Sequence, residues 1–105
     1  MNDDAQTQAP VYSDFANDPD FAEILQMFME TIPERQQSLE EAHRAGEIEQ
    51  VQSYAHQLKG AGGGYGFKGL TAAAAGLEDA CRADDIDSIF ENLDRLLNYM
   101  SCMSM

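Results

Sequence analysis

Hydrophobic residues recur along this chain at intervals of three and four positions, which is the spacing of amphipathic helices. Stripes of this kind occur at about residues 20–46, 47–64, 67–83 and 85–100. None of them shows the alternation of apolar and polar residues that is typical of a half-buried strand. The pattern therefore predicts a chain built from helices.

The first stripe consists of Phe21, Ile24, Leu25, Phe28 and Ile32. Asp18 followed by Pro19 predicts the start of its helix, because aspartate caps helices and proline is tolerated in the first turn. Pro33 either begins a second helix or kinks a continuous one, since it lacks an N–H group and clashes with the preceding turn. Leu39 continues the stripe, and Gly46 is expected to end it.

Two further helices are predicted from Glu47 to Gly64 and from about Phe67 to Ala83, with glycines between them that allow the chain to turn back. Tyr65 and Phe67 are interpreted as core residues that close this hairpin. Asp84 or Asp85 is expected to cap the last helix. The predicted core positions of that helix are Ile86, Ile89, Phe90, Leu93, Leu96, Leu97 and Met100.

Four major helices with short connections predict an all-α fold, an antiparallel up-down-up-down four-helix bundle with an additional short N-terminal helix. Residues 1–16 are polar and show no periodicity, and we expect them to form a mobile N-terminal tail. A length of 105 residues is suited to one domain. We therefore expect a single domain over residues 17–105.

Composition excludes several classes of function. A net charge of −13 argues against nucleic acid and against anionic membranes, which both attract basic patches. No apolar run approaches the roughly 18 residues of a membrane span, and the first residues lack a secretory signal, so a soluble cytoplasmic protein is expected. Cys81 and Cys102 form neither a disulfide framework nor a paired metal-ligand motif, and Cys81 is expected to be buried.

The distribution of charge is more informative than its total. No aspartate or glutamate occurs between Glu49 and Glu78, yet this window contains both lysines of the chain, Lys59 and Lys68, together with His56. One interpretation is a locally neutral to basic face that favours an acidic partner. The other is that the window is simply the most buried hairpin.

His56 lies away from the apolar face of its helix. At about 100° per residue, His56 is about 160° from Leu58, the centre of that face, and it is flanked by Gln52, Lys59 and Gly60. The imidazole is therefore expected to face solvent. An exposed imidazole is largely neutral at pH 7, so the lone pair of one ring nitrogen is available as a nucleophile.

Lys59 and Gly60 follow His56 by three and four positions, which places them beside it on a helix. The ammonium of Lys59 would lie near an anion carried on His56, and Gly60 would allow a second protein to approach the ring. Glycine inside a helix costs about 1 kcal/mol relative to alanine. The spacing of His56, Lys59 and Gly60 suggests phosphoryl transfer between proteins.

At these residues the chain resembles the histidine-containing phosphotransfer (HPt) domains of bacterial and eukaryotic phosphorelays. The family pattern is His-x-Leu-Lys-Gly-Ser/Ala-Ala/Ser/Gly, then a short spacer and Gly, and it is matched by His56, Leu58, Lys59, Gly60, Ala61, Gly62 and Gly66. A downstream run is similar to the family's next helix, through Leu70, Ala73, Leu77, Glu78, Ala80 and Arg82. The resemblance covers roughly residues 20 to 100. The chain departs from it at Ala61, where many members carry serine, and in its three consecutive glycines at 62–64.

The resemblance implies a phosphoryl carrier without its own kinase or ATP site, in a phosphorelay of a two-component system. A ring nitrogen of His56, Nε2 in the family, is expected to accept a phosphoryl group from an aspartate of a response-regulator receiver domain and to pass it to another receiver. Lys59 would offset phosphate charge and Gly60 would clear the approach, and Lys68 and Gln52 are further candidates. The chain is expected to be a monomer that binds no cofactor or metal itself, while Mg²⁺ is held by carboxylates of the receiver.

Other functions remain open alternatives. A helical adaptor could dock receiver domains without transfer, although its expected signature is a replaced His56. A phosphoacceptor domain of the chemotaxis-kinase type would receive phosphate from a kinase's ATP site, and a hybrid sensor histidine kinase is a further partner. The Glu-x-x-His at Glu40 and His43 would need a second such motif for a di-metal site. The glycine run lacks the Gly-Lys-Ser/Thr ending of a P-loop.

Overall fold

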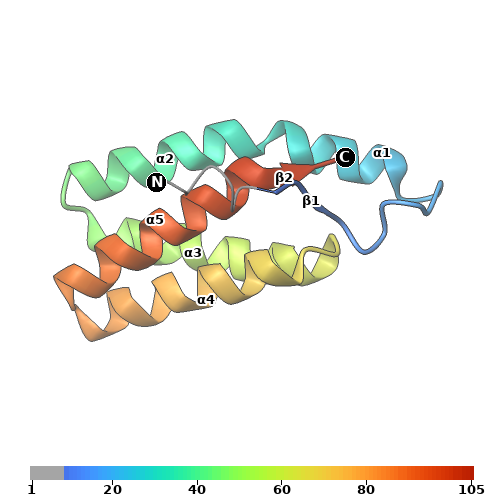
Figure 1. Ribbon diagram of the computed structural model, residues 1–105. Helices are drawn as coiled ribbons and strands as arrows, with labels where there is room; N and C mark the ends of the chain where they lie inside the picture. Colours follow the sequence, from blue (N-terminus) through green and yellow to red (C-terminus); the bar gives the residue numbers. More distant parts are fainter. Residues whose placement is uncertain (1–8) are drawn as a thin grey trace.

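Helices account for most of residues 9–105, the part of the chain that this computed structural model describes (Figure 1). Their bounds are α1 Ala22–Glu30, α2 Ile32–Arg44, α3 Ile48–Gly64, α4 Lys68–Ala83 and α5 Ile86–Cys102. Figure 1 shows the chain turning back at each short connection between α2 and α5. The all-helical class predicted from the periodicity is confirmed.

The helix α1 begins later than the sequence predicts. The backbone N–H of Asp20 donates to Asp18 Oδ1 at 2.9 Å, and that of Phe21 donates to the Asp18 carbonyl at 3.0 Å, so this segment is a turn. Asp18 therefore caps the turn and not the helix. Pro33 lies in the first turn of α2, where its missing N–H group would have no helical partner. Of the two interpretations of Pro33, the start of a second helix is the correct one.

The remaining helix ends follow local backbone chemistry. Gly46 follows α2 with a φ of +77°, a left-handed conformation that glycine adopts without steric cost. Asp85 is the N-cap of α5, because its Oδ1 accepts a hydrogen bond from the Ser88 N–H at 3.2 Å. Asp84 instead adopts a left-handed conformation that ends α4, so Asp85 is the cap of the two candidates.

The core lies between the helices and contains mostly aliphatic side chains. Its fully buried members include Leu39, Val51, Leu58, Phe67, Leu70, Leu77, Ile89, Leu96 and Met100. Phe28 stacks on Tyr65 with ring centroids 4.1 Å apart, which joins α1 to the end of α3. Cys81 is buried, as expected.

Three predicted core positions are exposed. Ile24 is 45% exposed, Ile86 is 78% exposed and Phe90 is 65% exposed. Ile86 is the first residue of α5, and Phe90 lies one turn further along the same side. A helical repeat predicts which residues share a face, but it does not set how widely the neighbouring helices cover that face.

The segment before α1 packs against the C-terminus and against the turn between α3 and α4. Its strand β1 (Val11–Tyr12) pairs in parallel with β2 (Met103–Ser104). Ser13 Oγ donates to the Tyr65 carbonyl at 2.6 Å, and the N–H of Asp14 donates to the Gly66 carbonyl at 2.8 Å.

These contacts correct the predicted tail of residues 1–16. Residues 11–15 belong to the packed part of the chain, because the α3–α4 turn and the C-terminus offer them backbone partners that lie far away in sequence. Residues 9, 10 and 16 belong to no helix or strand, and residues 1–8 are outside the described residues.

Helices α3 and α4 approach each other closely at Gly62. A Cβ atom at Gly62 would lie 2.7 Å from the Thr71 nitrogen, which is nearer than a side chain allows. Thr71 Oγ1 donates to the Lys59 carbonyl at 3.0 Å, which links the two helices. This contact lies in the first turn of α4, just after the turn that joins it to α3.

Candidate functional site

His56 projects from the middle of α3 with 68% of its side chain exposed. Its Nδ1 lies 2.9 Å from Oε2 of Glu78 on α4. Within residues 9–105, no polar group pairs with the other ring nitrogen, Nε2. The imidazole is therefore anchored through one nitrogen and open at the other.

Glu78 is a buried carboxylate, only 3% exposed, that gathers three side chains. Its Oε1 lies 2.7 Å from Lys59 Nζ, and its Oε2 lies 2.9 Å from both His56 Nδ1 and an Arg82 guanidinium nitrogen. The hydrogen bond from Lys59 lowers the pKa of Glu78 from 4.5 to about 2, assisted by the hydrogen bond from His56 and the charges of Lys59 and Arg82 and opposed by burial. Glu78 is therefore ionised at neutral pH.

An ionised Glu78 decides how the imidazole is protonated. A carboxylate without a proton can only accept hydrogen bonds, so Nδ1 must carry the hydrogen that it donates to Oε2. In the neutral ring the lone pair then belongs to Nε2. Because the side chain is 68% exposed and only its Nδ1 is paired with Glu78, Nε2 is the nitrogen that a second protein can reach.

The structure places Lys59 and Gly60 beside His56 in different ways. Lys59 is 37% exposed, and its ammonium is paired with Glu78. A Cβ atom at Gly60 would meet nothing within 4 Å, so this glycine does not serve packing inside the bundle. Gly60 leaves an open surface one helical turn after His56.

The two weaker candidates are not joined to His56. Lys68, at the start of α4, is 89% exposed, and its ammonium lies 3.6 Å from Asp14 Oδ2. Gln52 lies one turn before His56 on the same helix and is half-buried. No hydrogen bond within residues 9–105 links either side chain to His56.

Glu78 and its link to His56 were not predicted as part of the site. One signal was available in the sequence, because Glu78 follows Ala74 by four positions and precedes Cys81 by three, and both are buried. A carboxylate on a core-facing helical stripe needs a partner. Glu78 is also the first acidic residue after Glu49 in the sequence. Its buried carboxylate balances the positive charge of Lys59, which lies near His56.

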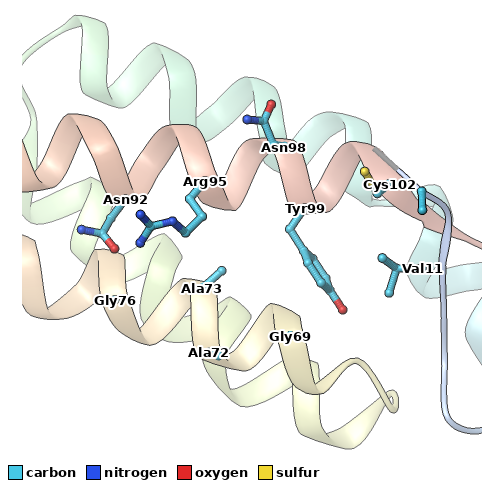
Figure 2. A pocket seen from close by; sticks show the side chains of 11 residues that line it. Val11, Gly69, Ala72, Ala73, Gly76, Asn92, Arg95, Asn98, Tyr99 and Cys102 are labelled. Carbon is cyan, nitrogen blue, oxygen red and sulfur yellow. The ribbon is translucent and has the colours of Figure 1, made fainter. Parts of the chain in front are cut away.

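A groove on the described surface lies elsewhere. It has a volume of about 530 Å³ and runs between α4 and α5, where small side chains of α4 face Asn92, Arg95 and Tyr99 of α5 (Figure 2). His56, Lys59 and Gly60 do not line it. The site at His56 is thus an exposed side chain on a helix, which is suited to a protein partner and not to an enclosed small molecule.

The second histidine has different surroundings. His43 lies in the last turn of α2, and its ring is 6.1 Å from the ring of Phe90.

Among residues 9–105 no group of three His, Cys, Asp or Glu side chains could hold a metal ion. Over the same residues, no helix is both long and apolar enough to cross a membrane.

Comparison with protein families assigns the chain. The model of the Hpt domain family matches residues 23–103, which include α2 to α5 and most of α1. The chain therefore belongs to the Hpt domain family, as the motif around His56 predicts. Hpt domains carry phosphoryl groups in phosphorelay signalling, where they interact with receiver domains and kinases and are not themselves kinases. Searches of curated proteins and of solved structures found no significant match.

Proposed function

We propose that His56 is the phosphoacceptor, and that Nε2 takes a phosphoryl group from a receiver aspartate and gives it to another receiver. The observation that carries the proposal is the pairing of His56 Nδ1 with the buried, ionised Glu78. This pairing leaves the lone pair on the exposed nitrogen. It supplies orientation and the correct tautomer, two requirements of a nucleophilic imidazole.

The transfer step needs no group beyond the two proteins and the receiver's Mg²⁺. The Nε2 lone pair attacks the phosphorus, an N–P bond forms, and the P–O bond to the receiver aspartate breaks with its electron pair leaving on the carboxylate. The Nδ1 proton stays on the ring, which becomes positively charged. Glu78 faces that charge at 2.9 Å and stabilises it as it develops.

The neighbouring residues have supporting roles in this proposal. Lys59, within reach of the exposed ring, offsets charge on the transferred phosphate, and Gly60 lets the receiver surface lie against α3. The antiparallel up-down-up-down bundle, with α1 as its additional short helix, holds α3 and α4 in place. We assign Lys68 and Gln52 no direct contact with the phosphate.

The proposed partners are response-regulator receiver domains and a hybrid sensor histidine kinase, bound by a cytoplasmic monomer that holds no cofactor or ATP. An adaptor that docks without transfer is not favoured, because such a protein would have no use for an imidazole with a fixed tautomer. A phosphoacceptor of the chemotaxis-kinase type would share this geometry and differ in its donor.

The test is to follow labelled phosphate on the full chain. Incubation with a receiver phosphorylated on its aspartate, in the presence of Mg²⁺, should give acid-labile phosphohistidine at His56. A parallel incubation with a histidine kinase and ATP, without a receiver, should give none. A stable complex with receivers but no label would establish the adaptor, and label from kinase and ATP alone would establish the chemotaxis-type domain.

A further inference from the structure

The two oxygens of Glu78 have unequal surroundings. Oε1 is fully buried and faces Lys59 Nζ at 2.7 Å. Oε2 is shared, because His56 Nδ1 and an Arg82 guanidinium nitrogen both lie 2.9 Å from it. Arg82 therefore donates to the same carboxylate oxygen that His56 contacts.

Arg82 is held in a defined position by two carboxylates. One guanidinium nitrogen pairs with Glu78, one helical turn earlier on α4, and the other lies 3.2 Å from Asp79 Oδ1. The planar guanidinium fixes the direction of its donors, so these two contacts together orient the group toward Oε2. Among residues 9–105, no hydrogen bond or ion pair joins Arg82 to His56 directly.

We propose that Arg82 is a positioning residue for His56 that acts through Glu78. By donating to the oxygen that holds the Nδ1 hydrogen, Arg82 limits how strongly Glu78 favours the doubly protonated ring, and so it keeps the Nε2 lone pair available. The inference rests on the proposed function, in which that lone pair is the nucleophile. It adds a residue on α4 to the control of a reaction that takes place on α3.

The protonation of the ring depends on the balance of the charges around it. A carboxylate beside an imidazole favours the imidazolium form, which has no lone pair and cannot attack phosphorus. Glu78 faces the ring, Lys59 from α3 and Arg82 from α4 face Glu78, and Asp79 faces Arg82. The positive charges of Lys59 and Arg82 oppose the effect of Glu78 on the protonation of the ring. Arg82 does so at Oε2, the oxygen that His56 also contacts.

The test is a pH titration of the imidazole nitrogens of the full unphosphorylated chain by ¹⁵N NMR. Arg82→Gln keeps a donor but removes the charge, and it should increase the protonation constant of His56 by about threefold, the size of a partly exposed charge interaction. Arg82→Lys should restore most of the wild-type value. The ring of His43 serves as an internal reference that should not move.

A matched control is Arg95→Gln. Arg95 lies on α5 in the groove of Figure 2 and does not line the His56 site, so the same unit of charge is removed without contact with Glu78. This variant should titrate as the wild type does. A folded Arg82→Gln variant in which His56 titrates like the wild type overturns the inference, and so does an equal shift in Arg95→Gln.

The outcome is separable from that of the proposed function. If His56 titrates as expected but takes no label from a phosphorylated receiver, the proposed function fails and the link from Arg82 to His56 stands. If label is transferred normally and the Arg82→Gln titration is unchanged, the link fails and the phosphoacceptor stands. Should Arg82→Gln fail to fold, Arg82→Lys decides, because a wild-type titration there supports the charge argument and an increase as large as threefold contradicts it.

Discussion

Two histidines lie on helices of this protein, and they differ in what faces the ring. On α3, His56 donates from Nδ1 to a buried, ionised carboxylate of the neighbouring helix. At the end of α2, the ring of His43 faces Phe90, and no carboxylate among residues 9–105 is paired with it. The comparison teaches that a histidine on a helix surface is a common feature, and that a chemical role requires a partner that fixes its tautomer.

The largest expected effect is the loss of the phosphoacceptor itself. His56→Gln should abolish labelling from a phosphorylated receiver, while His43→Gln should be labelled as the wild type is. Both variants should remain folded, since surface substitutions usually change stability by no more than about 0.5 kcal/mol. Transfer assays and thermal unfolding on the two variants check this. Label on His43 would remove the distinction between the two histidines.

Docking can be separated from chemistry at Gly60. Gly60→Gln should reduce exchange with a receiver more than tenfold, because its side chain would project into open space beside His56. Its stability should rise by roughly 0.8 kcal/mol, since glutamine is the better helix former.

The matched variant for Gly60 is Gly62→Ala. Its Cβ atom would lie 2.7 Å from the Thr71 nitrogen, so it should lower stability by about 1–3 kcal/mol through overpacking. Its folded fraction should still exchange phosphate. A destabilised Gly60→Gln that exchanges at the normal rate would contradict the proposed approach of the receiver.

Glu78→Gln should slow transfer and also change the response of stability to pH. The pKa of Glu78 is lowered in the folded chain, from 4.5 to about 2. Its contribution to stability is therefore fully present above about pH 4.5 and is lost as the pH falls toward 2. Thermal unfolding of the wild type and the variant between pH 6 and 2 isolates the contribution of the ionised Glu78 to stability. Parallel curves for the two proteins would show that Glu78 is not held in its ionised form.

The smallest effect is expected at the lysines. Lys59→Ala should slow transfer several-fold, because one ammonium near the ring contributes to transition-state charge. It should also lower stability, because the buried Oε1 of Glu78 loses its partner. Lys68→Ala should leave the rate unchanged, since Lys68 pairs with Asp14 and not with the site. Single-turnover transfer rates for both variants measure the difference. Equal slowing in the two would indicate a general effect of charge on receiver binding.

Much of the fold was predictable because helices are local. The spacing of apolar residues located α2 to α5 closely, and Asp85 and Gly46 marked two of their ends. The errors arose where packing decides, as with Phe90, which shares a helical face with buried residues but is left uncovered. The prediction also missed the pairing of β1 with β2, because a two-residue strand leaves no periodicity to detect.

The sequence by itself determined which residues stand beside one another on α3. His56, Lys59 and Gly60 are neighbours because a helix returns to the same side every three to four residues, and the same repeat turns His56 away from the core. Only the tertiary structure decided that Glu78 would reach His56. That contact joins residues 22 positions apart on two helices that pack against each other, and these helices also approach closely where Gly62 lies beside Thr71. Helical periodicity fixes the angle of a side chain around its own axis, whereas the distance between two axes is set by the side chains packed between them.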